Sequence, residues 1–112
     1  MERRAQSRDD VYRILASEAP YLRDRFGVER LALYGSFARG EPGPHSDVDV
    51  LVELSRPLGL QFVALARYLE ARLGRRVDLA TFAAMRRAKE KRHHARRLAS
   101  IEEDVIYVQP SA

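Results

Sequence analysis

Two aspartates, Asp47 and Asp49, lie two residues apart in the stretch SDVDVLVEL. In a β-strand such residues point to the same face, with Cα atoms about 7 Å apart. Partly desolvated carboxylates at this distance repel each other, so either one stays protonated or a cation lies between them. Oxygen-only ligands favour a hard divalent ion such as Mg²⁺. The pair therefore indicates a metal site, although a lone D-x-D is more often two polar residues at a strand edge.

A third carboxylate, Asp78, lies in the stretch RRVDLAT, where Val77 and Leu79 point to the opposite face of a short strand. If this strand adjoins the strand of Asp47 and Asp49, three carboxylates converge on one edge of the sheet. Two metal ions about 3.5–4 Å apart that share such ligands support phosphoryl or nucleotidyl transfer. Taken alone, Asp78 has the simpler interpretation of a surface carboxylate.

The residues before the aspartate pair suit the binding of phosphate. Gly35 allows a sharp backbone turn, and Ser36 can offer a hydroxyl and a backbone N–H to a phosphate at the start of a short helical turn. Arg39 can reach a triphosphate, because a guanidinium matches phosphate oxygens in a bidentate fashion. Ser46, directly before Asp47, can bind a phosphate or orient a carboxylate.

Three helices are expected to support these residues. Apolar side chains recur at helical spacing over residues 7–26, and Pro20 predicts a break or kink there because it lacks an N–H. Residues 60–73 form a second, amphipathic helix. Thr81 can cap a third helix that runs to about Ser100.

Three strands are expected between these helices, over residues 28–34, 46–54 and 75–81, with one helical turn over 36–40. Residues 104–108 form either a short final strand or an extended tail. This order predicts an α/β (α+β) fold in which helices pack on a small sheet. It leaves open which neighbouring strands are parallel.

The composition predicts one globular domain, residues 1–112, in a chain that is 46% hydrophobic and 32% charged. No apolar run approaches the roughly 18 residues of a membrane span, and the first ten residues lack the apolar stretch of a signal peptide. The absence of cysteine excludes disulfides and thiolate metal sites. We therefore expect a cytoplasmic protein without a membrane segment.

The formal net charge of +4 is concentrated in RRAKEKRHHARR, residues 86–97. Such a run can attract phosphates or nucleic acid, or it can be the solvated face of a surface helix. Nucleic acid is the less favoured partner, because no aromatic residue interrupts the run to stack on bases. His93 and His94 point about 100° apart on a helix, so we expect surface residues rather than two ligands of one ion.

The combination of Gly35-Ser36, ten intervening residues and the Asp47–Asp49 pair resembles the signature of the polymerase-beta-type nucleotidyltransferase superfamily. The flanking stretches LALYGSFARG, SDVDVLVEL and RRVDLAT are similar to those of the minimal nucleotidyltransferases, which are single-domain proteins of about this size. The resemblance extends from about Phe26 to Val108. It implies a mixed sheet flanked by helices.

The resemblance also implies roles for the individual residues. Gly35 and Ser36 would hold the phosphates of a nucleoside triphosphate, expected to be ATP. Asp47 and Asp49 would bind two Mg²⁺ ions, and Asp78 would help to bind the catalytic ion and activate the attacking hydroxyl. Pyrophosphate would be the leaving group.

Many minimal nucleotidyltransferases are paired with a HEPN-domain toxin. In such pairs they resemble antitoxins that transfer AMP to a tyrosine of the toxin. The resemblance therefore implies a HEPN partner here and allows an oligomer or a hetero-oligomer with it. Two alternatives come from the residues themselves: a binding module that masks its partner without catalysis, and a nucleic-acid-binding protein that uses residues 86–97.

Overall fold

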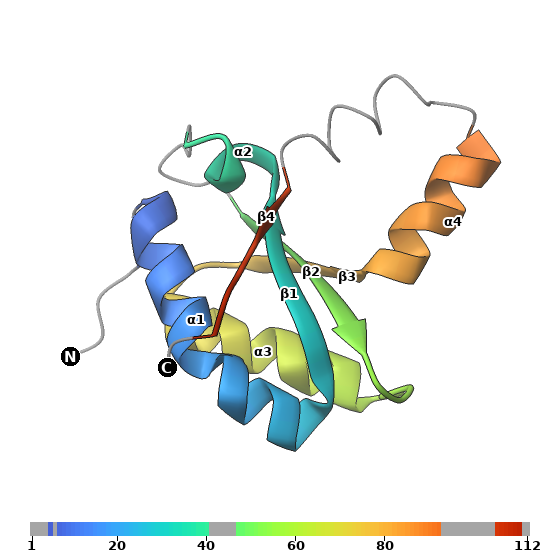
Figure 1. The fold of residues 1–112 in the computed structure, drawn as a ribbon, viewed down its shortest axis with the longest axis horizontal. Coiled ribbons are helices and arrows are strands. Elements are labelled where there is room, and N and C mark those ends of the chain that lie inside the picture. The colour runs from blue at the N-terminus through green and yellow to red at the C-terminus, as the bar shows by residue number, and fades with distance from the viewer. Residues whose placement is uncertain (1–4, 6, 41–46, 93–104, 111–112) are drawn as a thin grey trace.

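The computed structural model describes residue 5 and residues 7–40, 47–92 and 105–110 (Figure 1). Its elements follow the predicted order, with a short final strand at the end. They are α1 (Arg8–Phe26), β1 (Val28–Tyr34), α2 (Gly35–Ala38), β2 (Val48–Leu54), α3 (Gln61–Leu73), β3 (Val77–Thr81), α4 (Phe82–Arg92) and β4 (Ile106–Tyr107). Residues 41–46, which include Ser46, and the part of the expected last helix beyond Arg92, which includes His93 and His94, lie outside the described residues.

The four strands form one mixed sheet in the order β3-β2-β1-β4. β1 pairs antiparallel with both β2 and β4, whereas β2 and β3 are parallel. The parallel pair requires a crossover connection, which α3 supplies. The predicted fold class, a small mixed sheet flanked by helices, is confirmed.

The two faces of the sheet are covered differently. α1 and α3 lie together on one face, as Figure 1 shows, and the side chains of Val48, Val50 and Val52 are fully buried there. The opposite face carries a smaller apolar cluster built on Leu51 and Phe82. α4 begins at this second face and leads away from the sheet (Figure 1). The strand expected over residues 46–54 is thus confirmed as β2.

α1 begins where the sequence predicts, since the Ser7 side chain accepts a hydrogen bond from the backbone N–H of Asp10. It ends at Gly27, which has a φ of 71°. The predicted break at Pro20 does not occur, because one helix continues through this residue to Phe26. Pro20 itself is exposed, while buried residues on both sides of it, Leu15 and Leu22 among them, hold the helix on the sheet. Tertiary packing therefore outweighs the loss of one backbone hydrogen bond.

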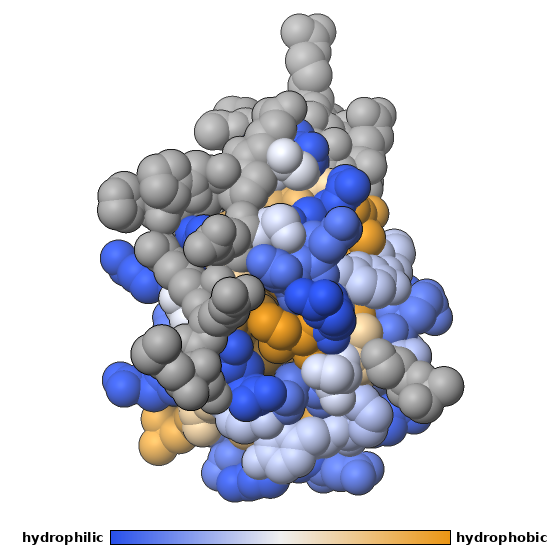
Figure 2. Space-filling view, turned by 90° about the vertical axis from the view of Figure 1, so that its left-hand side faces the viewer, coloured by the Kyte–Doolittle hydropathy of each residue, from blue (hydrophilic) through white to orange (hydrophobic). Residues whose placement is uncertain are grey.

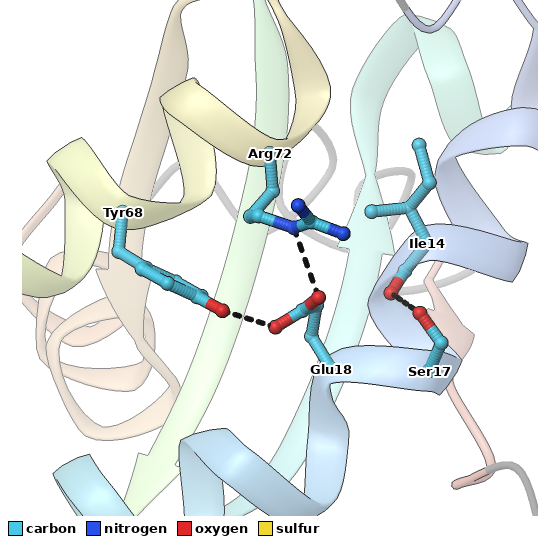
Figure 3. A network of polar contacts seen from close by, with 5 residues as sticks. All are labelled: Ile14, Ser17, Glu18, Tyr68 and Arg72. Atoms are coloured by element: carbon cyan, nitrogen blue, oxygen red, sulfur yellow. Dashed lines mark hydrogen bonds and ion pairs between the residues drawn. The ribbon is translucent and has the colours of Figure 1, made fainter. Parts of the chain in front are cut away.

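A polar network fastens α1 to α3 (Figure 3). The Tyr68 hydroxyl donates a hydrogen bond to one carboxylate oxygen of Glu18, and the Nε of Arg72 lies 2.9 Å from the other. Burial, followed by the hydrogen bond to Glu18, raises the pKa of Tyr68 to about 12. The phenol therefore remains a donor at neutral pH, and the network helps to set the position of the two helices that support the sheet.

The surface on the left-hand side of Figure 1, which faces the viewer in Figure 2, is mainly hydrophilic, with small apolar areas between the polar side chains. Within the described part of the chain, no helix combines the length and the apolar character that crossing a membrane would need.

Candidate active site

Asp49 and Asp78 lie side by side on adjacent strands. Because β2 and β3 are parallel, Asp49 is the register partner of Asp78. The start of β3 is held there by a hydrogen bond of 2.8 Å from the backbone N–H of Val48 to the carbonyl oxygen of Arg76. Asp47 directly precedes β2. The strands that carry Asp49 and Asp78 are therefore adjacent, which is the condition for the carboxylates to converge on one edge of the sheet.

The carboxylates influence one another electrostatically. Asp49 is half-buried, whereas Asp47 and Asp78 are exposed. Burial, followed by the charges of Asp78 and Asp47, raises the pKa of Asp49 from 3.8 to about 6, although Arg39 opposes this shift. Ionised Asp49 is thus held against an unfavourable field, which a bound cation would relieve.

The turn after β1 comes very close to Asp49. Gly35 has a φ of 74°, and a Cβ atom at this position would lie 2.2 Å from Oδ2 of Asp49. Only glycine satisfies both the backbone conformation and the contact. The sharp turn is one reason for a glycine at position 35, and the close contact with the Asp49 carboxylate is a second reason.

Ser36 lies in the four-residue helix α2, which is firmly attached to the fold. Phe37 of this helix is fully buried in the main core. The Nη1 of Arg8 donates a hydrogen bond of 3.2 Å to the carbonyl oxygen of Ala38. The predicted phosphate-binding turn is therefore held in place from both α1 and the core, directly beside the carboxylates.

The predicted phosphate ligand Arg39 ends α2 and is exposed. Its charge lowers the pKa of Asp49, so the guanidinium lies within electrostatic reach of the carboxylates. The structure thus brings together Gly35, Ser36 and Arg39 with the aspartates.

Tyr34, which directly precedes Gly35, belongs to the same region. It is the register partner of Asp49 across β1 and β2, and it packs against the apolar cluster of Leu51. Burial, followed by the charges of Asp78 and Asp49, raises the pKa of Tyr34 to about 12. Its hydroxyl stays neutral beside the carboxylates. The position of Tyr34 beside Asp49 follows from the antiparallel pairing of β1 with β2, which the sequence left open.

The donor set suits a divalent cation by its chemistry. Three carboxylates offer hard oxygen ligands, and the raised pKa of Asp49 reflects repulsion between them. Among the described residues, however, no group of three or more His, Asp or Glu side chains is already gathered closely enough to hold an ion. The roles of Asp47, Asp49 and Asp78 as metal ligands remain predictions.

Comparison with known proteins adds independent information. A family model described as a nucleotidyltransferase domain matches residues 19–108. The protein adenylyltransferase MntA of Thermococcus cleftensis is 46% identical over 72 residues, which cover 63% of this chain and 73% of that protein. A Methanocaldococcus jannaschii protein, provisionally named a protein adenylyltransferase, is 38% identical over 102 residues, or 88% of this chain and 95% of its own.

Among solved structures, a mutant form of the MntA–HpeT toxin–antitoxin is similar with a TM-score of 0.61. The likeness covers 95% of this chain and 75% of that chain at 15% identity. At this identity it demonstrates a shared fold.

Proposed function

Because the chain belongs to the nucleotidyltransferase domain family, we propose that it is an antitoxin that transfers AMP from ATP to a tyrosine of a HEPN-domain toxin. The observation that carries this proposal is the pairing of Asp49 with Asp78 beside the Gly35 turn. The choice of a protein as acceptor is supported by related proteins that are named protein adenylyltransferases. The choice of a toxin is supported by the fold shared with a toxin–antitoxin.

Each part of the site has a distinct task in this proposal. Gly35 and Ser36 bind the phosphates of ATP, assisted by Arg39 and Ser46. Asp47 and Asp49 bind two Mg²⁺ ions with Asp78. When bound, such ions neutralise charge on the phosphate oxygens.

The reaction exchanges a phosphoanhydride bond of ATP for a phosphate ester bond to tyrosine. The tyrosine oxygen forms a bond to the α-phosphorus, and the bond from this phosphorus to the bridging oxygen of the β-phosphate breaks, which releases pyrophosphate. The carboxylate of Asp78 takes the phenolic proton. Most of the acceleration then comes from positioning and electrostatics, as is general for phosphoryl transfer.

The acceptor hydroxyl comes from another protein in this proposal. The described residues build one sheet with its flanking helices, and every element among them contributes to that unit. A single domain over residues 1–112 would leave the acceptor to be presented by the toxin or by a second copy of the chain.

The test mixes the purified protein with a cognate partner, Mg²⁺ and labelled ATP. We expect the label on a tyrosine of the partner, identified by mass spectrometry, and no transfer by the Asp47→Asn/Asp49→Asn double variant. Equal transfer by the double variant, or no transfer by the wild-type protein, would contradict the proposal.

The alternative is a module that neutralises the partner by binding alone. The small size of the chain favours it, because a domain of this size has little stability to spare and gains from a covering partner. Co-expression with the toxin separates the two functions. Rescue of growth by the double variant would mean that masking is sufficient, whereas failure to rescue, with the complex intact, would mean that catalysis is required.

A further inference from the structure

A pocket lies on the same face of the sheet as the carboxylates. It is a cavity of about 250 Å³. Its apolar lining consists of Leu51, Phe82, Met85, Val105 and Tyr107. We call it the Leu51 pocket. Two larger hollows, of about 440 and 470 Å³, adjoin it through Tyr107 and Phe82 respectively, but Leu51 lines neither of them.

The Leu51 pocket is close to the reacting groups. Leu51 follows Asp49 by two positions on β2, so both side chains point to the same face about 7 Å apart. Tyr107 of β4 is the register partner of Ala32, which itself pairs with Leu51. The pocket therefore continues the surface of the site in the direction of β4.

The pocket and the Gly35 turn lie in opposite directions from Asp49 along β2. In an in-line displacement, the attacking and leaving oxygens lie on opposite sides of phosphorus. Tyr34 pairs with Asp49, and the next residue, Gly35, therefore lies beside the Val48 end of β2. Leu51 lies in the opposite direction along β2. If Gly35 and Ser36 hold the leaving phosphates, the acceptor enters past Leu51.

Two stacked aromatic rings form one wall of the pocket, and its rim is cationic. The ring of Phe82 stacks on that of Tyr107 with centroids 5.8 Å apart and an interplanar angle of 7°. The guanidinium of Arg30 lies 4.9 Å from the centre of the Phe82 ring and is paired with Glu53 at 3.2 Å. Arg86 also lines the pocket and is exposed. An apolar group with an acidic neighbour would complement this arrangement.

We propose that the Leu51 pocket binds an apolar side chain of the acceptor protein, two residues from the modified tyrosine in an extended segment that also carries an acidic residue. Side chains two residues apart in an extended peptide are separated by about 7 Å and share a face, which matches the spacing from Asp49 to Leu51. This inference rests on the proposed protein adenylylation and adds the sequence that the acceptor must present.

The first experiment uses short synthetic peptides with one tyrosine and one flanking aspartate. Leucine stands two residues from the tyrosine in the first peptide and next to it in the second, and serine replaces it in the third. We expect binding and AMP transfer to be strongest for the first peptide, because an adjacent leucine points to the other side of an extended chain. Equal transfer to all three would overturn the inference while leaving adenylylation intact.

The second experiment places a charge in the pocket. Met85→Glu puts a carboxylate in the lining, whereas Ala83→Glu puts the same side chain at an exposed position of the same helix, outside this lining. We expect Met85→Glu to lower kcat/KM for the first peptide about tenfold or more, with unchanged affinity for ATP, and Ala83→Glu to leave both unchanged. Equal losses in ATP and peptide affinity would instead assign the pocket to the nucleotide and overturn the inference.

Peptide binding, measured in a variant that is expected not to transfer AMP, tests the pocket separately from the proposed adenylylation. Fluorescence polarisation of labelled peptides on the Asp47→Asn/Asp49→Asn protein measures the pocket independently of chemistry. Preference for the first peptide there, abolished by Met85→Glu, would support the pocket even if no enzyme preparation transferred AMP. Thermal unfolding of both glutamate variants confirms that they are folded, and absence of any preference in the folded double variant would overturn the inference.

Discussion

Among the single residues, Asp49 determines the electrostatics of the site. Its pKa in the folded protein, about 6, lies above its ordinary value of 3.8. The protonated form therefore favours folding. This stabilisation is fully present below about pH 4 and is lost as the pH rises through about 6. In the absence of a cation, the ionised carboxylate destabilises the folded protein at neutral pH.

We expect Asp49→Asn to stabilise the metal-free protein at neutral pH while abolishing transfer. The full shift corresponds to about 3 kcal/mol, but solvent screening of this partly exposed group reduces the expected gain to about 1 kcal/mol. Urea unfolding with a chelator present, at about pH 7.5 and again at about pH 4, measures it, and the gain disappears at the lower pH. The exposed Glu29, changed to Gln, is the control. A loss of stability at about pH 7.5 would contradict this assignment.

Gly35 combines two constraints that can be separated by mutation. Gly35→Ala faces both the positive φ and the contact with Asp49, so we expect it to lower the free energy of unfolding by about 2–4 kcal/mol and to remove activity. Gly59 has a φ of 56°, and no atom lies within 4 Å of the position that its Cβ would occupy, so Gly59→Ala should cost only about 1 kcal/mol. Urea unfolding and transfer assays compare them. Similar effects of both changes would mean that the carboxylate contact contributes nothing.

At the scale of the elements, the network of Glu18 connects α1 to α3. The Glu18 side chain is only 12% exposed and accepts from both Tyr68 and Arg72. We expect Glu18→Gln to lower the free energy of unfolding by about 1.5 kcal/mol, because the charge and one of the two acceptor oxygens are lost. Arg13, whose side chain is 77% exposed, pairs with Asp10 within α1, and Arg13→Gln should cost less than about 0.5 kcal/mol. Equal losses in chemical unfolding would show that the network adds nothing beyond a surface ion pair.

The elements could be predicted well where local patterns dominate. Alternating valines identify β2, and the cap residues Ser7, Thr81 and Gly74 mark helix ends because each satisfies backbone groups locally. The break expected at Pro20 does not occur, because the local rule ignores the sheet on which α1 packs. The direction of neighbouring strands was also beyond local patterns, since it depends on contacts between residues far apart in the chain.

At the scale of the whole molecule, the two faces of the sheet differ in what they carry. One face packs against α1 and α3 and provides the main core. The other face carries the carboxylates, Tyr34 and the Leu51 pocket in one continuous surface. A domain of this size can thus leave one side of its sheet for the proposed active site, because the other side buries most of the large apolar residues.

The sequence by itself determined the residue types, their faces and the family, since Gly35-Ser36 and Asp47–Asp49 are local motifs whose spacing can be read along the chain. Only the tertiary structure decided that Asp78 stands beside Asp49 and that Tyr34 faces the carboxylates. It also decided that Tyr107 helps to close a pocket over Leu51. The physical reason is that strand order and register arise from the packing of the whole sheet, so these neighbours are set by contacts across the chain rather than by their local sequence.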